Sequence, residues 1–217
     1  MSARCNRDPS VVAERLGHLH DPHMAPLTAF VERLRVQRGG GQSVPWFDPS
    51  DAGVAAKVLL LFEAPGPLAV GSDSPRPHAK GSGIISCHNN DGSAATVHDL
   101  RLLAGLADEN GSALCLHWNI VPWYVGDGSK IRPVSDDDLI EAQAALRALL
   151  RLLPDLKVVV LAGQAAQRGW ARLVLRDTPG LPTVPCLHTS PRVTNTQPEA
   201  KDRILRALTL ARLLAEA

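Results

Sequence analysis

The sequence predicts a three-layer α/β/α fold with a central, mainly parallel four-stranded sheet. Residues 58–62 and 158–161 are continuous apolar runs of strand length, which is typical of strands buried on both faces of a parallel sheet. Residues 114–121 and 184–187 are further strand-like runs, and all four alternate with segments of helical periodicity. Because parallel strands need crossover connections, this alternation predicts helices on both faces of the sheet.

The first predicted helix covers residues 24–36, where Leu27, Phe30, Val31 and Leu34 repeat at helical spacing. The segment that follows, residues 44–49, is too rich in proline for a strand, and we expect it to cover an edge of the sheet. The remaining helices are expected over residues 96–107, 135–153, 164–175 and 198–215.

Composition predicts one globular domain. The chain has 217 residues, 45% of them apolar, and a formal charge of +1. We expect a single domain over residues 1–217, in which residues 1–23 form a flexible N-terminal arm. The near-zero charge argues against a protein dominated by electrostatic contact with nucleic acid. It does not exclude a local basic rim on a neutral scaffold.

The cysteines and the apolar runs bear on cofactors and location. Cys5, Cys87, Cys115 and Cys186 lie far apart without a C-x-x-C pair, so their spacing predicts neither a zinc ribbon nor an iron–sulfur cluster. No metal or other cofactor is expected. No apolar run approaches the ~20 residues that span a bilayer, and residues 1–9 lack a signal-peptide pattern. We therefore expect a cytoplasmic protein with no membrane partner.

Polar residues follow three of the predicted strands. Glu63 begins a Glu-Ala-Pro-Gly corner after the first strand, Asn119 lies near the end of the second, and His188 follows the fourth. If the strands are parallel, these corners meet at the carboxyl edge of the sheet, where open α/β sheets bind ligands. The sequence thus predicts a site that combines a carboxylate, an amide and an imidazole.

Each residue type has a chemical use and an ordinary alternative. A carboxylate at Glu63 would be costly to bury without a task or a partner. The Asn119 amide complements the N3–H and O4 edge of uracil, or it bonds to the backbone of a neighbouring loop. His188 is either structural or a positioned donor that stabilises a departing anion. Gly66 permits positive φ or the close approach of a ligand.

The ordered set Glu63-Ala64-Pro65-Gly66, Asn119-Ile120-Val121-Pro122 and His188-Thr189-Ser190-Pro191 resembles the uracil-DNA glycosylase superfamily over about residues 44–207. The Glu-Ala-Pro-Gly corner is most similar to the branch that normally carries an iron–sulfur cluster. This chain lacks the cysteine pattern of that branch and so resembles a cluster-free relative.

The resemblance implies a monofunctional base excision repair enzyme, which hydrolyses the N-glycosidic bond of deoxyuridine in DNA and leaves an abasic site. It implies catalytic roles for Glu63 and His188 and base reading by Asn119. Uracil-containing DNA and the abasic product would be its partners, and it would act as a monomer. The other residues that the resemblance places at the substrate are Ala64, Pro65, Gly66, Ile84, Asn89 and Asp91, with Ser190, Pro191 and Arg192 on the DNA.

Two departures from the family pattern shape these expectations. The best-studied members have an aspartate where this chain has Ala64, so activation of water passes to Glu63, to the Asn89–Asp91 segment or to no side chain. Residues 81–86 lack the aromatic that normally stacks on the base, and Ile84 would supply an apolar face instead. The main alternative is therefore a low-turnover protein that binds uracil-containing or abasic DNA.

A covalent trap for the sugar and a nucleotide-binding module of another kind have less support. The trap would need a basic insertion before His188, which is absent. The nucleotide-binding module would be indicated by a G-x-G-x-x-G or P-loop sequence, and neither occurs.

Overall fold

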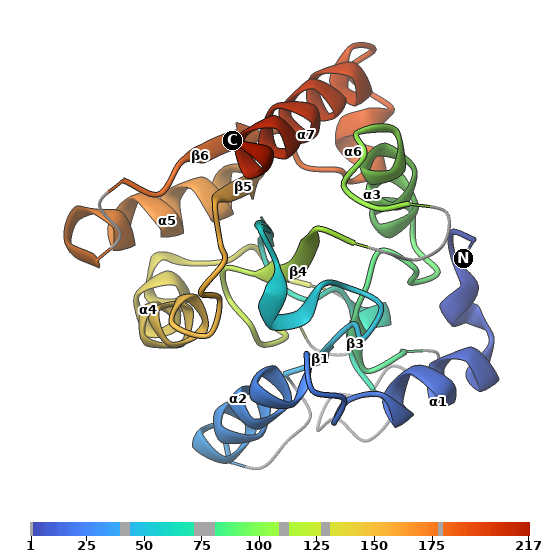
Figure 1. Ribbon diagram of the computed structural model, residues 1–217, viewed down its shortest axis with the longest axis vertical. Coiled ribbons are helices and arrows are strands. Elements are labelled where there is room, and N and C mark those ends of the chain that lie inside the picture. Colours follow the sequence, from blue (N-terminus) through green and yellow to red (C-terminus); the bar gives the residue numbers. More distant parts are fainter. Residues whose placement is uncertain (1, 40–43, 72–80, 109–112, 127–130, 178–179) are drawn as a thin grey trace.

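The computed structural model describes residues 2–39, 44–71, 81–108, 113–126, 131–177 and 180–217, with the backbone alone for 173–177. Its main sheet has the order β4-β2-β5-β6, and every neighbouring pair is parallel. The strands are β2 (Val58–Phe62), β4 (Cys115–Asn119), β5 (Val158–Ala162) and β6 (Thr183–Cys186). The predicted α/β fold with a four-stranded parallel sheet is confirmed (Figure 1).

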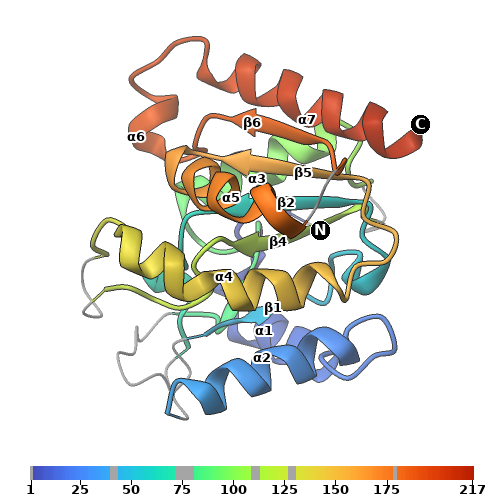
Figure 2. The ribbon, with the colours of Figure 1, turned by 90° about the vertical axis from the view of Figure 1, so that its left-hand side faces the viewer.

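Helices cover both faces of this sheet. The first face packs against α2 (Ala25–Gln37), α4 (Asp136–Leu150) and α5 (Gln164–Asp177). The second packs against α3 (Gly92–Leu103) and α7 (Ala200–Glu216). In Figure 2, α4 and α5 lie in front of the sheet and α3 lies behind it.

Alternation along the strands explains why both faces are apolar. In β2, Leu59 and Leu61 belong to the first core, and Val58 and Leu60 belong to the second. Each such buried side chain contributes about 1.5–3 kcal/mol relative to an exposed one. The continuous apolar run that predicts β2 is thus the mark of a strand with a core on each side.

The N-terminal segment packs against the domain. It forms η1 (Cys5–Arg7) and α1 (Pro9–Gly17), and the Asp8 side chain caps α1 by accepting from the Ser10 N–H. Asn6 is buried, and its backbone N–H donates to the His88 carbonyl at 3.1 Å. The segment that the sequence predicts to be a flexible arm thus contains two helices, and hydrogen bonds of the buried Asn6 join it to the rest of the domain.

A second, two-stranded parallel sheet pairs β1 (Trp46–Phe47) with β3 (Ile84–Ile85). The expectation that residues 44–49 contain no strand is wrong at these two positions. Phe47 is buried and stacks on Trp118 of β4, with ring centroids 3.7 Å apart. The segment thus covers the main sheet with an aromatic ring.

The remaining elements are short. They are η2 (Gly53–Ala55), η3 (Pro67–Ala69) and α6 (Pro191–Thr194), which follows β6. Within the described part of the chain, we find no helix that combines the length and the apolar composition needed to cross a membrane.

Candidate active site at the carboxyl edge of the sheet

The backbone joins the first two predicted corners. Phe62, the last residue of β2, is the register partner of Asn119 at the end of β4. Beyond the strands, the Ile120 N–H donates to the Phe62 carbonyl at 2.7 Å, and the Val121 N–H donates to the Glu63 carbonyl at 3.0 Å. Glu63 and Asn119 therefore leave the sheet side by side.

The third corner, that of His188, contacts the end of β2 at Phe62. The His188 ring meets the Phe62 ring edge-on, with centroids 6.3 Å apart and planes at 82°. His188 also lies close enough to the Glu63 and Asp91 carboxylates for both to act on its pKa. The three corners thus converge around the end of β2.

The topology of the sheet favours a ligand site at this point. The connection after β2 leads to α3 on one face, whereas those after its neighbours β4 and β5 lead to α4 and α5 on the other. Connections that diverge in this way leave a crevice above the strand ends.

His188 is held in one tautomer. The backbone N–H of Ser190 donates to Nδ1 of His188 at 3.0 Å, so Nδ1 carries no proton and the neutral ring carries its proton on Nε2. Burial lowers the pKa of His188 below its ordinary 6.5, although Glu63 and Asp91 act in the opposite sense. The site therefore presents a neutral N–H donor near pH 7.

Asn119 carries an acceptor that has no partner in the described part of the chain. The residue is 5% exposed, and among the described residues no group donates to its Oδ1. A buried acceptor of this kind lowers the folding stability by about 1–3 kcal/mol unless a ligand or water donates a hydrogen bond to it. The Thr189 Oγ1, next to His188, also lacks a partner within the described residues. Asn119 ends β4 and Thr189 follows β6, so both unsatisfied atoms lie at the carboxyl edge of the sheet, and such atoms are typical of places that a polar ligand or water completes.

Glu63 is half-buried and held by the backbone. Its Oε1 accepts from the Val134 N–H at 3.2 Å, in the loop before α4. Next to it, Ala64 packs against the first core and Pro65 is buried. Gly66 has φ −75°, so of its two possible uses positive φ does not apply; a Cβ would meet nothing within 4 Å among the described atoms.

Three other predicted residues support the site instead of lining it. The Asn89 Oδ1 accepts from Asn6 and Ser82, and its Nδ2 donates to the Ile84 carbonyl, so its amide is engaged. Ile84 itself is 0% exposed and presents no accessible face to a base. Asp91 caps α3 by accepting from the Ala94 N–H at 2.8 Å. In the structure, these three residues are thus engaged in hydrogen bonds or buried in the domain.

The predicted DNA-contacting residues lie on α6 and at its start. Pro191 and Arg192 are exposed, and Ser190 is half-buried. A Cβ added to Gly92 would lie 2.5 Å from Cγ of Pro191, so the first turn of α3 packs tightly against this loop. Figure 1 shows α6 beside α3.

A buried ionic cluster that the sequence does not predict lies beneath this edge. Asp51 accepts from the His117 backbone N–H at 2.9 Å, from His117 Nδ1 at 2.8 Å and from Arg101 at 3.0 Å. Burial acts to raise the pKa of Asp51, but His117 and Arg101 outweigh it and lower the pKa to about 2. The chain separates these partners by 50 and 66 residues, so no local pattern signals them.

The same cluster has the residue types of a metal site. Ligand atoms of Asp51, Cys115 and His117 lie within 4.8 Å of one another. However, the Arg101 guanidinium already neutralises Asp51, and burial raises the pKa of Cys115 to about 12, which disfavours the thiolate that a metal binds. The donor set therefore does not fit a cation.

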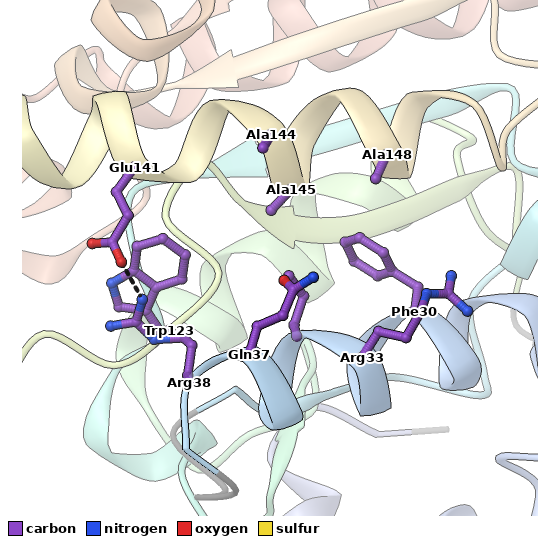
Figure 3. A pocket seen from close by; sticks show the side chains of 10 residues that line it. Phe30, Arg33, Gln37, Arg38, Trp123, Glu141, Ala144, Ala145 and Ala148 are labelled. Atoms are coloured by element: carbon purple, nitrogen blue, oxygen red, sulfur yellow. Dashed lines mark hydrogen bonds and ion pairs between the residues drawn. The ribbon is translucent and has the colours of Figure 1, made fainter.

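A groove of about 240 Å³ lies between α2 and α4 (Figure 3). Arg38 stacks on Trp123 at 3.8 Å and forms an ion pair with Glu141 at 2.7 Å. No residue of the three corners lines this groove within the described chain. Because Trp123 follows Asn119 by four residues, these contacts anchor the Asn119 corner from the first face of the sheet.

Comparison with known proteins adds no family assignment. No protein-family model matches the chain, and no curated protein matches it in sequence.

Proposed function

We propose that this protein is a DNA glycosylase that hydrolyses the N-glycosidic bond of deoxyuridine in DNA, releasing uracil and leaving an abasic site. The observation that carries the proposal is that two suitable groups lie at the carboxyl edge of the sheet. His188 has its N–H donor fixed on Nε2, and the Oδ1 of Asn119 has no partner among the described residues. The enzyme would act as a cytoplasmic monomer in base excision repair, with no metal or organic cofactor.

Base choice would rest on Asn119. Its Oδ1 would accept from N3–H of a flipped uracil, and its Nδ2 would donate to O4. Cytosine presents a bare N3 and an amino group at these positions, so both hydrogen bonds would be lost. A site with buried polar groups discriminates strongly against a base that leaves them unpaired.

Bond cleavage would rest on His188. As the glycosidic bond lengthens, negative charge grows on the uracil, and the Nε2–H would donate to O2. Such a positioned donor contributes about 10²–10³-fold in rate. A neutral donor is well suited here, because it needs no proton from solvent and its lowered pKa keeps the ring uncharged near pH 7.

The water step is assigned to Glu63. Ala64 has no group to act on water, and the Asp91 carboxylate is engaged as a helix cap. Glu63 is held at the site by the Val134 N–H, and its charge would favour the cationic sugar and a water molecule near it.

DNA contact would come from Ser190, Pro191 and Arg192. The exposed Arg192 would fill the gap that the flipped nucleotide leaves. Backbone N–H groups near the exposed loop would contact phosphates, which suits a chain whose net charge is only +1.

Ala64 favours one second candidate. Without a carboxylate at that position, the chain would bind uracil-containing or abasic DNA with slow turnover. Tight binding without strand scission would support this candidate over the enzyme.

The test is a cleavage assay. Purified protein is incubated with an end-labelled oligonucleotide containing one uracil, and alkali then breaks the strand at any abasic site. Matched oligonucleotides with thymine and hypoxanthine are the controls. Scission at uracil alone, absent without protein, supports the proposal, and an intact uracil strand at enzyme excess contradicts it.

A further inference from the structure

His188 rests against a glycine that follows the neighbouring strand. Gly163 comes directly after β5, and its N–H donates to the Cys186 carbonyl at the end of β6. A Cβ added at Gly163 would lie 3.1 Å from Cδ2 and 3.2 Å from Cβ of His188. Both distances are shorter than ordinary carbon contacts, so any larger residue here would push the imidazole outward.

Three groups therefore fix the His188 ring. The Ser190 N–H fixes its tautomer through Nδ1, the Phe62 ring meets it edge-on, and Gly163 sets how deeply it sits. Of these three, Gly163 acts through the absence of a side chain. Its contact with the ring involves no polar atom of His188.

We propose that Gly163 is a positioning residue for His188: its missing side chain sets the depth of the ring and thereby the place of the Nε2–H donor. The inference rests on the proposed glycosylase function, since that function gives the donor its task. A side chain at Gly163 would displace the His188 ring by a few tenths of an ångström, and this displacement would move the Nε2–H donor away from O2 of the base. Because this contact strengthens in the transition state, the effect falls on kcat more than on KM.

The chain offers a matched control for backbone strain. Gly163 has φ +88°, a conformation that disfavours any residue with a Cβ. Gly180 has nearly the same φ, +91°, but a Cβ there meets nothing within 4 Å in the described part of the chain. Gly163→Ala and Gly180→Ala thus share the strain, and only Gly163→Ala adds the clash with His188.

Single-turnover and steady-state excision of uracil by both variants tests the proposal. Gly163→Ala is expected to lower kcat about tenfold, with KM nearly unchanged, because small misplacements of catalytic groups have large effects on rate. Gly180→Ala is expected to retain the kcat of the unmodified protein. Equal kcat values in the two variants, or a loss confined to KM, would overturn the proposal.

Two NMR measurements test the positioning without relying on activity. In the unmodified protein, an Hα of Gly163 is expected to show a nuclear Overhauser effect to Hδ2 of His188. The Ser190 amide proton, which reports the bond to Nδ1, is expected to shift in Gly163→Ala and not in Gly180→Ala. Absence of the Overhauser effect overturns the proposal even if Gly163→Ala does not fold. If both NMR results are as expected and the protein does not excise uracil, the proposed function is refuted and the positioning of His188 by Gly163 stands.

Discussion

The Ser190 backbone N–H and His188 Nδ1 form a hydrogen bond of 3.0 Å within a three-residue turn. This bond leaves Nε2 as the protonated nitrogen of the neutral ring. A second proton would have to enter at Nδ1, where the Ser190 N–H already points. The turn therefore opposes the imidazolium form, in the same direction as burial of the ring, which lowers the pKa of His188.

The proposed excision of uracil is expected to depend on pH through His188. The pKa of His188 lies below its ordinary 6.5, so the neutral donor is the main form of the ring at pH 6.5 and above. We expect the acidic midpoint of the kcat profile to lie below pH 6.5. A pH profile of kcat checks this, and an acidic midpoint at or above pH 6.5 would contradict it.

Replacement of His188 removes the donor. His188→Ala is expected to lower kcat about 10²–10³-fold, the usual effect of removing a transition-state donor. The His188→Ala variant should also lose less folding stability in acid than the unmodified protein. In the unmodified protein, the pKa of His188 is lower in the folded state than in the unfolded state. The unfolded state therefore binds the proton better, and stability is lost as the pH falls below 6.5. Kinetics and urea unfolding at two pH values measure both effects.

Replacement of Asn119 tests base reading. Asn119→Asp keeps the shape but cannot donate to O4, so excision of uracil should fall by at least about tenfold, the cost of one unpaired polar group. Since the Oδ1 of Asn119 has no partner among the described residues, the substitution breaks no hydrogen bond of this atom, and circular dichroism checks that the buried carboxylate leaves the protein folded. Unchanged uracil excision by this variant would remove Asn119 from the reading role.

The buried Asp51–Arg101 pair is expected to matter for stability. Arg101→Met leaves the Asp51 carboxylate buried with only His117 as a partner among the described residues, at a cost of about 3–5 kcal/mol in the free energy of unfolding. The double variant Asp51→Asn, Arg101→Met should cost less than this, since no uncompensated charge remains. Urea unfolding measures both, and equal losses would show that the ion pair is not the cause.

Acid is also expected to loosen the N-terminal segment. Burial lowers the pKa of His88 to about 4, and its neutral ring contacts the Ser2 carbonyl and Arg101. Stability from this contact is present above pH 6.5 and is lost as the pH falls through about 4. The protection factor of the Asn6 amide, which is bonded to the His88 carbonyl, should then fall. His88→Gln is the control, because in this variant the protection factor of Asn6 should depend less on pH.

The sequence predicts the strands and the order of their polar corners, since buried parallel strands leave continuous apolar runs. The helix predicted from residue 96 begins four residues earlier, as α3. Asp91-Gly92 has the composition of a turn, but Asp91 caps a helix that begins at Gly92. The sequence does not predict β1 and β3, because each has two residues and is formed by tertiary pairing.

The sequence predicts the corners of the site and not their supports. Glu63 and His188 follow strands and Asn119 ends one, so the parallel topology places all three at the carboxyl edge of the sheet. The contact of Gly163 with His188, the place of Phe62 between corners, and the Asp51–Arg101–His117 cluster depend on how distant segments pack. The hydrogen bonds of Asn89 are also not predictable from the sequence, because its partner Asn6 is 83 residues away, in a segment that the sequence predicts to be an arm.

The most direct measurement is the single-turnover rate of uracil release from duplex and single-stranded DNA by the unmodified protein, Asn119→Ala and His188→Ala. Circular dichroism should first confirm that all three are folded alike. We predict excision by the unmodified protein and a loss of at least about 100-fold in each variant. Full activity in both folded variants would contradict the assignment of this sheet edge as the active site.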